Sequence, residues 1–214
     1  MSPVRSLRVV CAALTIGAVT SGCSVEPAER HEADVRERET GWRGIALDSA
    51  PPKPDFALTD ANGDPFDFRS ETDGYVTFLF FGYTSCPDVC PTTLGDLKQV
   101  RQQLGEDGEQ VQVVFVTVDP DRDTQVRLAD YLSLFDPTDI GLTGSEEQLM
   151  PVYQAYGVYR AIDTTTQTAT GYLVDHSSRL YLIDQQGNLR LTYTYGTQPE
   201  DIASDVANLL KNQE

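Results

Sequence analysis

Apolar residues form two kinds of pattern along the chain. Two continuous apolar runs, "YVTFLFF" at 75–81 and "VQVVFVTVD" at 111–119, are typical of strands buried on both faces of a sheet. Each run is followed by a segment in which apolar side chains recur every three or four positions, at 93–104 and 124–135, which predicts two amphipathic helices. This alternation favours parallel strands joined by helical crossovers.

The C-terminal half of the chain continues the alternation. A helix is predicted at 145–156, strands at 172–174, 179–184 and 189–195, and a last helix at 199–211. Between the last two strands, "QQGN" supplies turn residues, which indicates a hairpin. We therefore predict one α/β domain over residues 54–214, with a central mixed sheet flanked by helices.

Residues 1–23 form a separate unit. Arg5 and Arg8 give a basic start, residues 9–19 are apolar, and the small residues of "VTSGC" precede Cys23. This order indicates an export signal, and it resembles a bacterial lipoprotein signal in which Cys23 is lipidated and becomes the new N-terminus. The apolar run is about half of the ~20 residues that a membrane-spanning helix needs. We predict an extracytoplasmic protein that is lipid-anchored to the bacterial membrane; a signal peptide cleaved without lipidation of Cys23 is the alternative.

Composition limits the number of domains and the kinds of partner. With 214 residues, of which 40% are hydrophobic, the chain can bury one ordinary core. Residues 24–53 are charged, lack helix or strand periodicity and run into "APPKP", which predicts a flexible tether between the anchor and the domain. A formal net charge of -17 repels phosphate backbones and argues against a nucleic-acid partner.

The domain keeps two cysteines, because Cys11 lies in the signal and Cys23 would carry lipid. Cys86 and Cys90 stand in "SCPDVCP" directly after the first predicted strand, where the N-terminus of a helix favours thiolate over thiol. This layout resembles the thioredoxin-like superfamily, but the spacing is C-x-x-x-C and the usual redox motif is C-x-x-C. Positions i and i+4 of a helix have Cβ atoms about 5–6 Å apart, against ~3.8 Å in an unstrained disulfide. A structural disulfide, a redox couple and a metal site all stay open, and the wider gap favours the metal site.

Two further side chains are expected at the same edge of the sheet. His176 comes just before a predicted core strand, and with two thiolates it makes a soft donor set that suits copper and is one ligand short of a structural zinc site. Asp119 ends the second apolar run. Its carboxylate either orients His176 and affects thiol acidity, or serves with Asp123 at the start of the next helix.

Four segments, in this order and spacing, resemble the Sco/SenC family of copper chaperones: "PDFALTDANGDPF", "FFGYTSCPDVCPTTL", "VFVTVDPDRDT" and "YLVDHSSRLYLID". The resemblance covers about residues 54–211 and implies a membrane-tethered, thioredoxin-like protein. It implies that Cys86, Cys90 and His176 bind one copper ion, as Cu(I) or Cu(II). It also implies a role in assembling the CuA centre in subunit II of cytochrome c oxidase, with another periplasmic copper chaperone or a thiol reductase as further partners.

The resemblance implies a metallochaperone rather than an enzyme. The alternative is a thiol–disulfide oxidoreductase that keeps the CuA cysteines reduced for metallation, in which Cys86 attacks a partner disulfide and Cys90 resolves the mixed disulfide. His176 separates the two readings, since copper needs the imidazole and exchange does not. A peroxidase on the same fold and an inert module with a structural disulfide are weaker alternatives, because neither needs this set of side chains.

Overall fold

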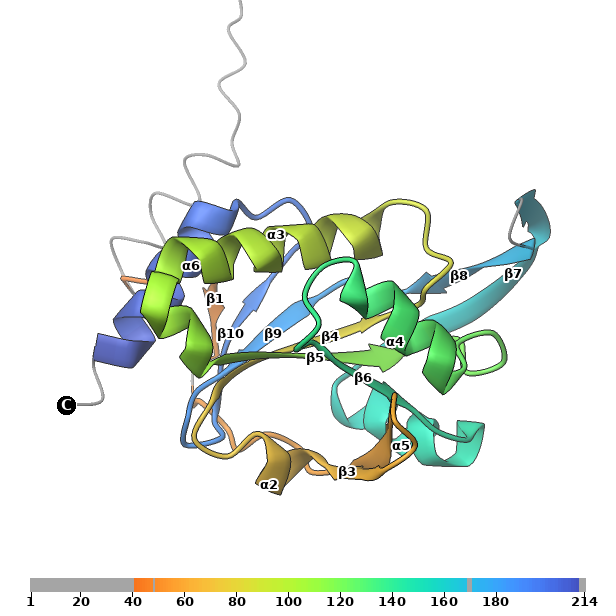
Figure 1. The fold of residues 1–214 in the computed structure, drawn as a ribbon, viewed down its shortest axis with the longest axis horizontal. Helices are drawn as coiled ribbons and strands as arrows, with labels where there is room; N and C mark the ends of the chain where they lie inside the picture. Colours follow the sequence, from red (N-terminus) through yellow and green to blue (C-terminus); the bar gives the residue numbers. More distant parts are fainter. Residues whose placement is uncertain (1–40, 48, 169–170, 212–214) are drawn as a thin grey trace, which may run out of the picture.

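The computed structural model describes residues 41–47, 49–168 and 171–211, and an eight-stranded sheet runs through them (Figure 1). The strand order is β1-β10-β9-β4-β5-β6-β2-β3. The strands β4, β5 and β6 pair in parallel and the other neighbours pair antiparallel, so the sheet is mixed, as predicted. The bounds are β1 Ile45–Ala46, β2 Ala57–Asp60, β3 Pro65–Asp67, β4 Val76–Gly82, β5 Val111–Thr117, β6 Ile140–Thr143, β9 Leu180–Ile183 and β10 Leu189–Tyr193.

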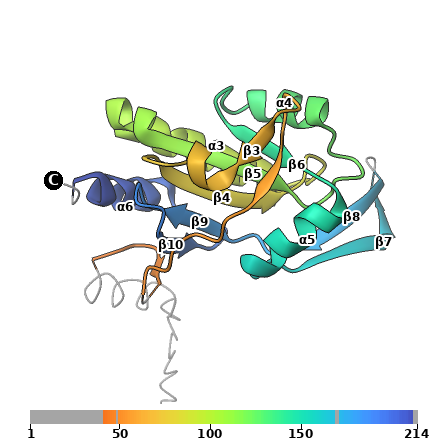
Figure 2. The ribbon, with the colours of Figure 1, turned by 90° about the horizontal axis from the view of Figure 1, so that it is seen from below.

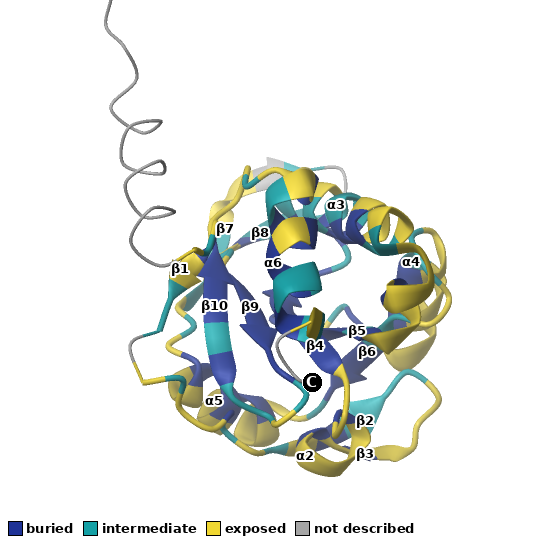
Figure 3. Ribbon diagram, turned by 90° about the vertical axis from the view of Figure 1, so that its left-hand side faces the viewer, coloured by how far each residue is buried: buried dark blue, intermediate teal, exposed yellow. Residues whose placement is uncertain are grey.

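Helices cover both faces of this sheet (Figures 1 and 3). The long helix α3 packs beside α6 on one face, with α4 next to β6, while α5 lies on the other face. The bounds are α2 Phe68–Glu71, α3 Val89–Leu104, the 3-10 helix η1 Gly105–Gln110, α4 Gln125–Ser133, α5 Glu146–Ala155 and α6 Pro199–Lys211. The α/β prediction is therefore confirmed.

The centre of the core is the pair β4 and β5. Every residue of β4 is buried, and so is every residue of β5 except Gln112. Strands enclosed on both faces need apolar side chains at successive positions, which explains why these two runs were visible as unbroken apolar segments.

Among the predicted boundaries that differ from the structure, three affect a functional residue. The first long helix begins at Val89 rather than at 93, so Cys90 lies inside it. The strand predicted at 111–119 ends at Thr117, so Asp119 lies beyond it. The strand predicted at 172–174 is longer, β8 Gly171–His176, and it ends on the histidine.

The strand β8 pairs with β7, Arg160–Thr168, as a separate two-stranded sheet that the sequence did not predict. The reason is composition: β7 reads RAIDTTTQT and carries almost no apolar alternation. This hairpin projects from the body of the domain beside the start of α3 (Figures 1 and 2).

The folded domain also begins earlier than predicted. Ile45 and Ala46 form β1 and pair with β10, Pro52 bridges to Asn188, and Lys53 is only 3% exposed. The prediction of a flexible tether is therefore wrong for residues 45–53, because this part of the chain is attached to the sheet. The rest of the predicted tether, residues 24–40, and the anchor residue Cys23 lie outside the described residues. No helix in the part that the structure describes is long and apolar enough to cross a membrane.

Candidate metal centre

The turn between β4 and α3 carries both cysteines. The backbone N–H of Cys86 donates to the carbonyl of Tyr83 (3.1 Å), which tightens the chain directly after the strand. Cys90 is the second residue of α3 and is fully buried, and its N–H donates to the Cys86 sulfur (3.4 Å). Helix N-terminal N–H groups have no partner within the helix, so one of them is available for this sulfur. Cys86 thus precedes the helix, and the spacing expected for two positions of one helix does not apply.

Gly82, the last residue of β4, makes room for the buried thiol. A Cβ at this position would lie 2.8 Å from the Cys90 sulfur and 2.8 Å from the ring of Phe115. Only a residue without a side chain fits there, and no pattern in the sequence singled it out.

His176 reaches the cysteines from the end of β8. Its Nδ1 lies 2.9 Å from the carbonyl oxygen of Ser177, which can only accept a hydrogen bond, so Nδ1 carries the proton. The other ring nitrogen, Nε2, faces the Cys90 sulfur at 3.9 Å. The imidazole also meets the edge of the Tyr83 ring, with 5.8 Å between ring centroids. Ligating histidines are usually oriented by a hydrogen bond from the ring nitrogen that does not bind the metal, as Nδ1 makes here.

The three donor atoms form a compact triangle. The sulfurs of Cys86 and Cys90 and one nitrogen of His176 all lie within 4.8 Å of one another, and this is the one such group among the described residues. Bonds of about 2.0–2.3 Å, as for zinc with these ligands, place the donors of a three-coordinate ion roughly 3.5–4.0 Å apart. The arrangement therefore fits one soft metal ion after small side-chain adjustments, and both cysteines are free thiols.

The two thiols differ sharply in acidity. The pKa of Cys86 is lowered to about 4, first by a hydrogen bond from the Cys90 thiol and then by His176 and the N–H groups of Cys90 and Asp88, against the effect of burial. The same hydrogen bond, together with burial, raises the pKa of Cys90 far above its usual value. These opposite pKa shifts belong to one pair of thiols, in which Cys86 loses its proton and Cys90 keeps its own.

A hollow of about 250 Å³ opens onto these groups. Its lining includes Tyr83, Cys86 and His176, together with Pro87, Asp88 and Asp175. Cys86 is partly exposed and Cys90 is buried. A metal ion here would be reached from one side, through Cys86.

Asp119 lies near this site without touching the histidine. It is fully buried, forms an ion pair with Arg122 and accepts a hydrogen bond from the Tyr172 hydroxyl (2.7 Å). The N-cap of α4 is Thr124, whose side chain accepts from the N–H of Arg127, so Asp119 does not cap this helix. Its carbonyl accepts from the N–H groups of Arg122 (3.1 Å) and Asp123 (2.9 Å), which form the turn ahead of α4. Arg122 and Tyr172 both stand in segments that carry the family resemblance, but neither was predicted as a functional residue, since neither is a metal ligand.

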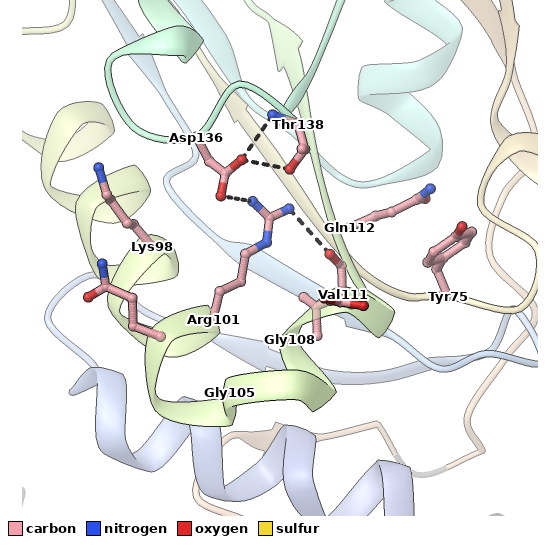
Figure 4. Close-up of a pocket in the computed structure, with 11 residues that line it drawn as sticks. Tyr75, Lys98, Arg101, Gly105, Gly108, Val111, Gln112, Asp136 and Thr138 are labelled. Atoms are coloured by element: carbon pink, nitrogen blue, oxygen red, sulfur yellow. Dashed lines mark hydrogen bonds and ion pairs between the residues drawn. The ribbon is translucent and has the colours of Figure 1, made fainter.

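A larger hollow, of about 590 Å³, lies at the far end of α3 (Figure 4). Arg101 crosses it and pairs with Asp136 (3.1 Å) and Asp139 (2.6 Å). Its lining contains neither cysteine nor histidine. This hollow is therefore separate from the candidate metal centre.

Comparisons with known proteins agree with this geometry. A family model described as SCO1/SenC matches residues 46–211. The SCO2-like protein of Rickettsia felis is 38% identical over 148 residues, which cover 69% of this chain and 72% of that protein.

Two solved structures share the fold. The copper-bound structure of ScoI from Bradyrhizobium japonicum is 36% identical, with a TM-score of 0.66 over 74% of this chain and 99% of that one. A SCO1/SenC family lipoprotein from Bacillus anthracis is 27% identical, with a TM-score of 0.63 over 76% of this chain and 96% of that one. These likenesses confirm the thioredoxin-like fold.

Proposed function

This chain belongs to the SCO1/SenC family, and from that premise we propose that it is a copper chaperone. It binds one copper ion through Cys86, Cys90 and His176 and delivers it to the CuA centre of cytochrome c oxidase subunit II. The observation that carries the proposal is the triangle of two sulfurs and one nitrogen within 4.8 Å. The copper-bound relative from Bradyrhizobium japonicum supports the choice of metal, as does the preference of thiolates for Cu(I).

Copper uptake follows from the protonation of the free site. The Cys86 thiolate is ready to bind, whereas the Cys90 thiol must lose its proton to the solvent as the metal enters. His176 would offer Nε2, the ring nitrogen that faces the sulfurs. Two thiolates more than offset the single positive charge of Cu(I) and hold it firmly. Because the hollow opens on the Cys86 side, thiolates of a partner can replace the ligands one at a time, which permits release.

A second candidate function rests on the same asymmetry of the thiols. A partly exposed thiolate at Cys86, with Cys90 behind it, is the arrangement of an attacking and a resolving cysteine. Cys86 would form a mixed disulfide with the partner and release one partner thiolate. Cys90 would then attack the Cys86 sulfur and release the other, so that this chain ends oxidised and needs an external thiol to be reduced again.

We also propose that the protein is lipid-anchored through Cys23 on the outer side of the bacterial membrane, with residues 24–40 as the tether. The order of basic, apolar and small residues before Cys23 supports the anchor. The Bacillus anthracis relative is itself a lipoprotein. An anchor of this kind would keep the domain close to a membrane-bound oxidase.

Copper titration of the reduced domain, residues 24–214, tests the ligand set. We expect one copper per chain, with weaker binding in Cys86→Ala, Cys90→Ala and His176→Ala. The matched control is His31→Ala, which changes the other of the two histidines in the chain and should leave the affinity unchanged. No stable copper binding, or binding that ignores His176, would make thiol–disulfide exchange the working function.

A further inference from the structure

The position of His176 is not fixed by the main sheet alone, although β9 begins at Leu180, four residues later. In the described part of the chain, β8 pairs with β7 and with no strand of the eight-stranded sheet. The hairpin projects from the domain (Figures 1 and 2), while both cysteines belong to the segment that follows β4. The distance between imidazole and thiols therefore depends on side chains that hold β8 against the body.

Arg122 is the centre of those contacts. Its Nη1 donates to the Tyr172 carbonyl (2.8 Å), and its guanidinium carbon lies 3.7 Å from the centroid of the Tyr172 ring. The buried carboxylate of Asp119 pairs with the guanidinium and also accepts from the Tyr172 hydroxyl at 2.7 Å. Backbone, ring and hydroxyl of one β8 residue are thus all held by the turn that follows β5.

The same contacts continue along β8 to the histidine. Successive side chains of a strand alternate between faces, so Tyr172, Val174 and His176 share one face, toward the domain. The Val174 N–H donates to the Tyr83 hydroxyl (3.4 Å), the guanidinium of Arg122 lies 5.7 Å from the Tyr83 ring, and this ring meets His176 edge-on. Arg122 and Tyr83 together fix the face of β8 that ends in the imidazole.

We propose that Arg122 is a positioning residue of the metal centre: by clamping Tyr172 it sets the distance from His176 to Cys86 and Cys90. This inference rests on the proposed copper-binding function. Arg122 does not bind the metal itself, so its loss acts through His176. Partners that orient a metal ligand typically change the affinity for the metal about 10–100-fold when they are removed.

The test is a double-substitution cycle on Cu(I) affinity, measured by competition with a chromophoric Cu(I) chelator on the reduced domain. Arg122→Ala should weaken Cu(I) binding about 10–100-fold, and Arg122→Lys should restore only part of it, because an ammonium cannot hold Asp119 and stack on Tyr172 together. In a His176→Ala background, Arg122→Ala should cause no further loss. The nitrogen hyperfine signal of the Cu(II) form should weaken in Arg122→Ala.

Arg101→Ala is the matched control. The Arg101 and Arg122 side chains are similarly buried, 12% and 17% exposed, and both pair with aspartates. Arg101 is eleven residues beyond Cys90 on α3, roughly 16 Å along the helix axis. Its loss should lower stability and leave Cu(I) affinity within about twofold. Tyr172→Phe, which removes only the hydroxyl, serves as a milder second variant in the same cycle should Arg122→Ala not fold.

Equal losses of affinity from Arg122→Ala with and without His176 would overturn the inference, since Arg122 would then act on the fold alone. An unchanged affinity in Arg122→Ala would overturn it too. In both cases wild type and His176→Ala still differ, so the proposed function survives. A wild-type protein that binds no copper, or binds it regardless of His176, overturns the proposed function and this inference with it.

Discussion

At the scale of single residues, the site depends on an asymmetry between two thiols four positions apart. Cys86 lies in a turn where a thiol and several N–H groups surround its sulfur, and Cys90 lies in the core. The reduced, metal-free protein therefore carries one thiolate and one thiol at neutral pH. This state suits both copper uptake and attack on a disulfide, so acidity alone does not separate the two functions.

The rate of Cys86 alkylation by iodoacetamide should change little between about pH 8 and pH 5. The reagent reacts with thiolate, and a pKa lowered to about 4 keeps Cys86 ionised throughout this range. In Cys90→Ala the largest cause of that shift is removed, so the pKa should rise toward 9.0 and the rate should fall about tenfold per pH unit below it. A wild-type rate that falls in the same way would contradict the assignment.

Gly82→Ala should damage fold and site together. Its Cβ would stand 2.8 Å from the Cys90 sulfur and from Phe115, and overpacking of this kind costs about 1–3 kcal/mol. We expect a lower free energy of unfolding in urea and weaker copper binding. Gly95→Ala, on α3 with nothing within 4 Å of the added Cβ, should instead stabilise the domain by about 0.5–1 kcal/mol. If both substitutions have the same effect, the close approach at Gly82 is not real.

At the scale of elements, the sequence was informative where burial is continuous or where a helix has one apolar face. The bounds of α6 were predicted to the residue, those of β4 to within one residue, and β5 was predicted two residues too long. The hairpin partner β7 was missed, because its threonines and glutamine give neither face of the strand a row of apolar side chains. The strand β1 was missed because two residues give no periodicity. Its pairing partner is β10, which is far away in the sequence.

The cysteines and His176 could be predicted as candidates from residue type and spacing, but the side chains that hold them could not. Gly82 is needed because the Cys90 sulfur, eight residues later in the chain, lies against it. Arg122 is important because it holds Tyr172 of β8, fifty residues further on. Such pairings are set by the tertiary fold. No local pattern marks them.

A domain that begins at residue 54 should be less stable than one that begins at residue 41. The buried Asp205 carboxylate accepts hydrogen bonds from the N–H groups of Arg43 (2.9 Å) and Gly44 (2.8 Å), and the shorter form loses both donors. We expect the free energy of urea unfolding to fall by more than about 2 kcal/mol. Asp205→Ala should cost less in the shorter form than in the longer one. Equal stabilities would mean that residues 41–53 behave as tether after all.

At the scale of the whole molecule, the first described residues and the candidate metal centre lie at opposite ends. The first described residues and β1 are at one end of the sheet, beside α6, and the β7–β8 hairpin and the start of α3 are at the other (Figures 1 and 2). A domain tethered by its N-terminus would therefore present the copper site away from its own anchor. That orientation suits delivery to a site raised above the membrane surface.

Cys23→Ser should release the full-length protein from the membrane. A lipidated cysteine supplies the anchor in our proposal, so wild type expressed in a bacterial host should incorporate labelled palmitate and sediment with membranes. The serine variant should do neither, while its purified domain should bind copper like wild type. Unlabelled wild type in the soluble extracytoplasmic fraction would instead show an ordinary cleaved signal peptide.

Transfer of copper to its acceptor tests the central claim most directly. The copper-loaded domain is mixed with the reduced, metal-free CuA domain of cytochrome c oxidase subunit II, and the visible spectrum of the CuA centre is followed. We predict that this spectrum develops as copper leaves the donor, and that it does not develop with metal-free donor. If no CuA spectrum appears, while the reduced, metal-free protein restores free thiols to an oxidised acceptor, the chaperone account is contradicted and the chain acts as a thiol reductase.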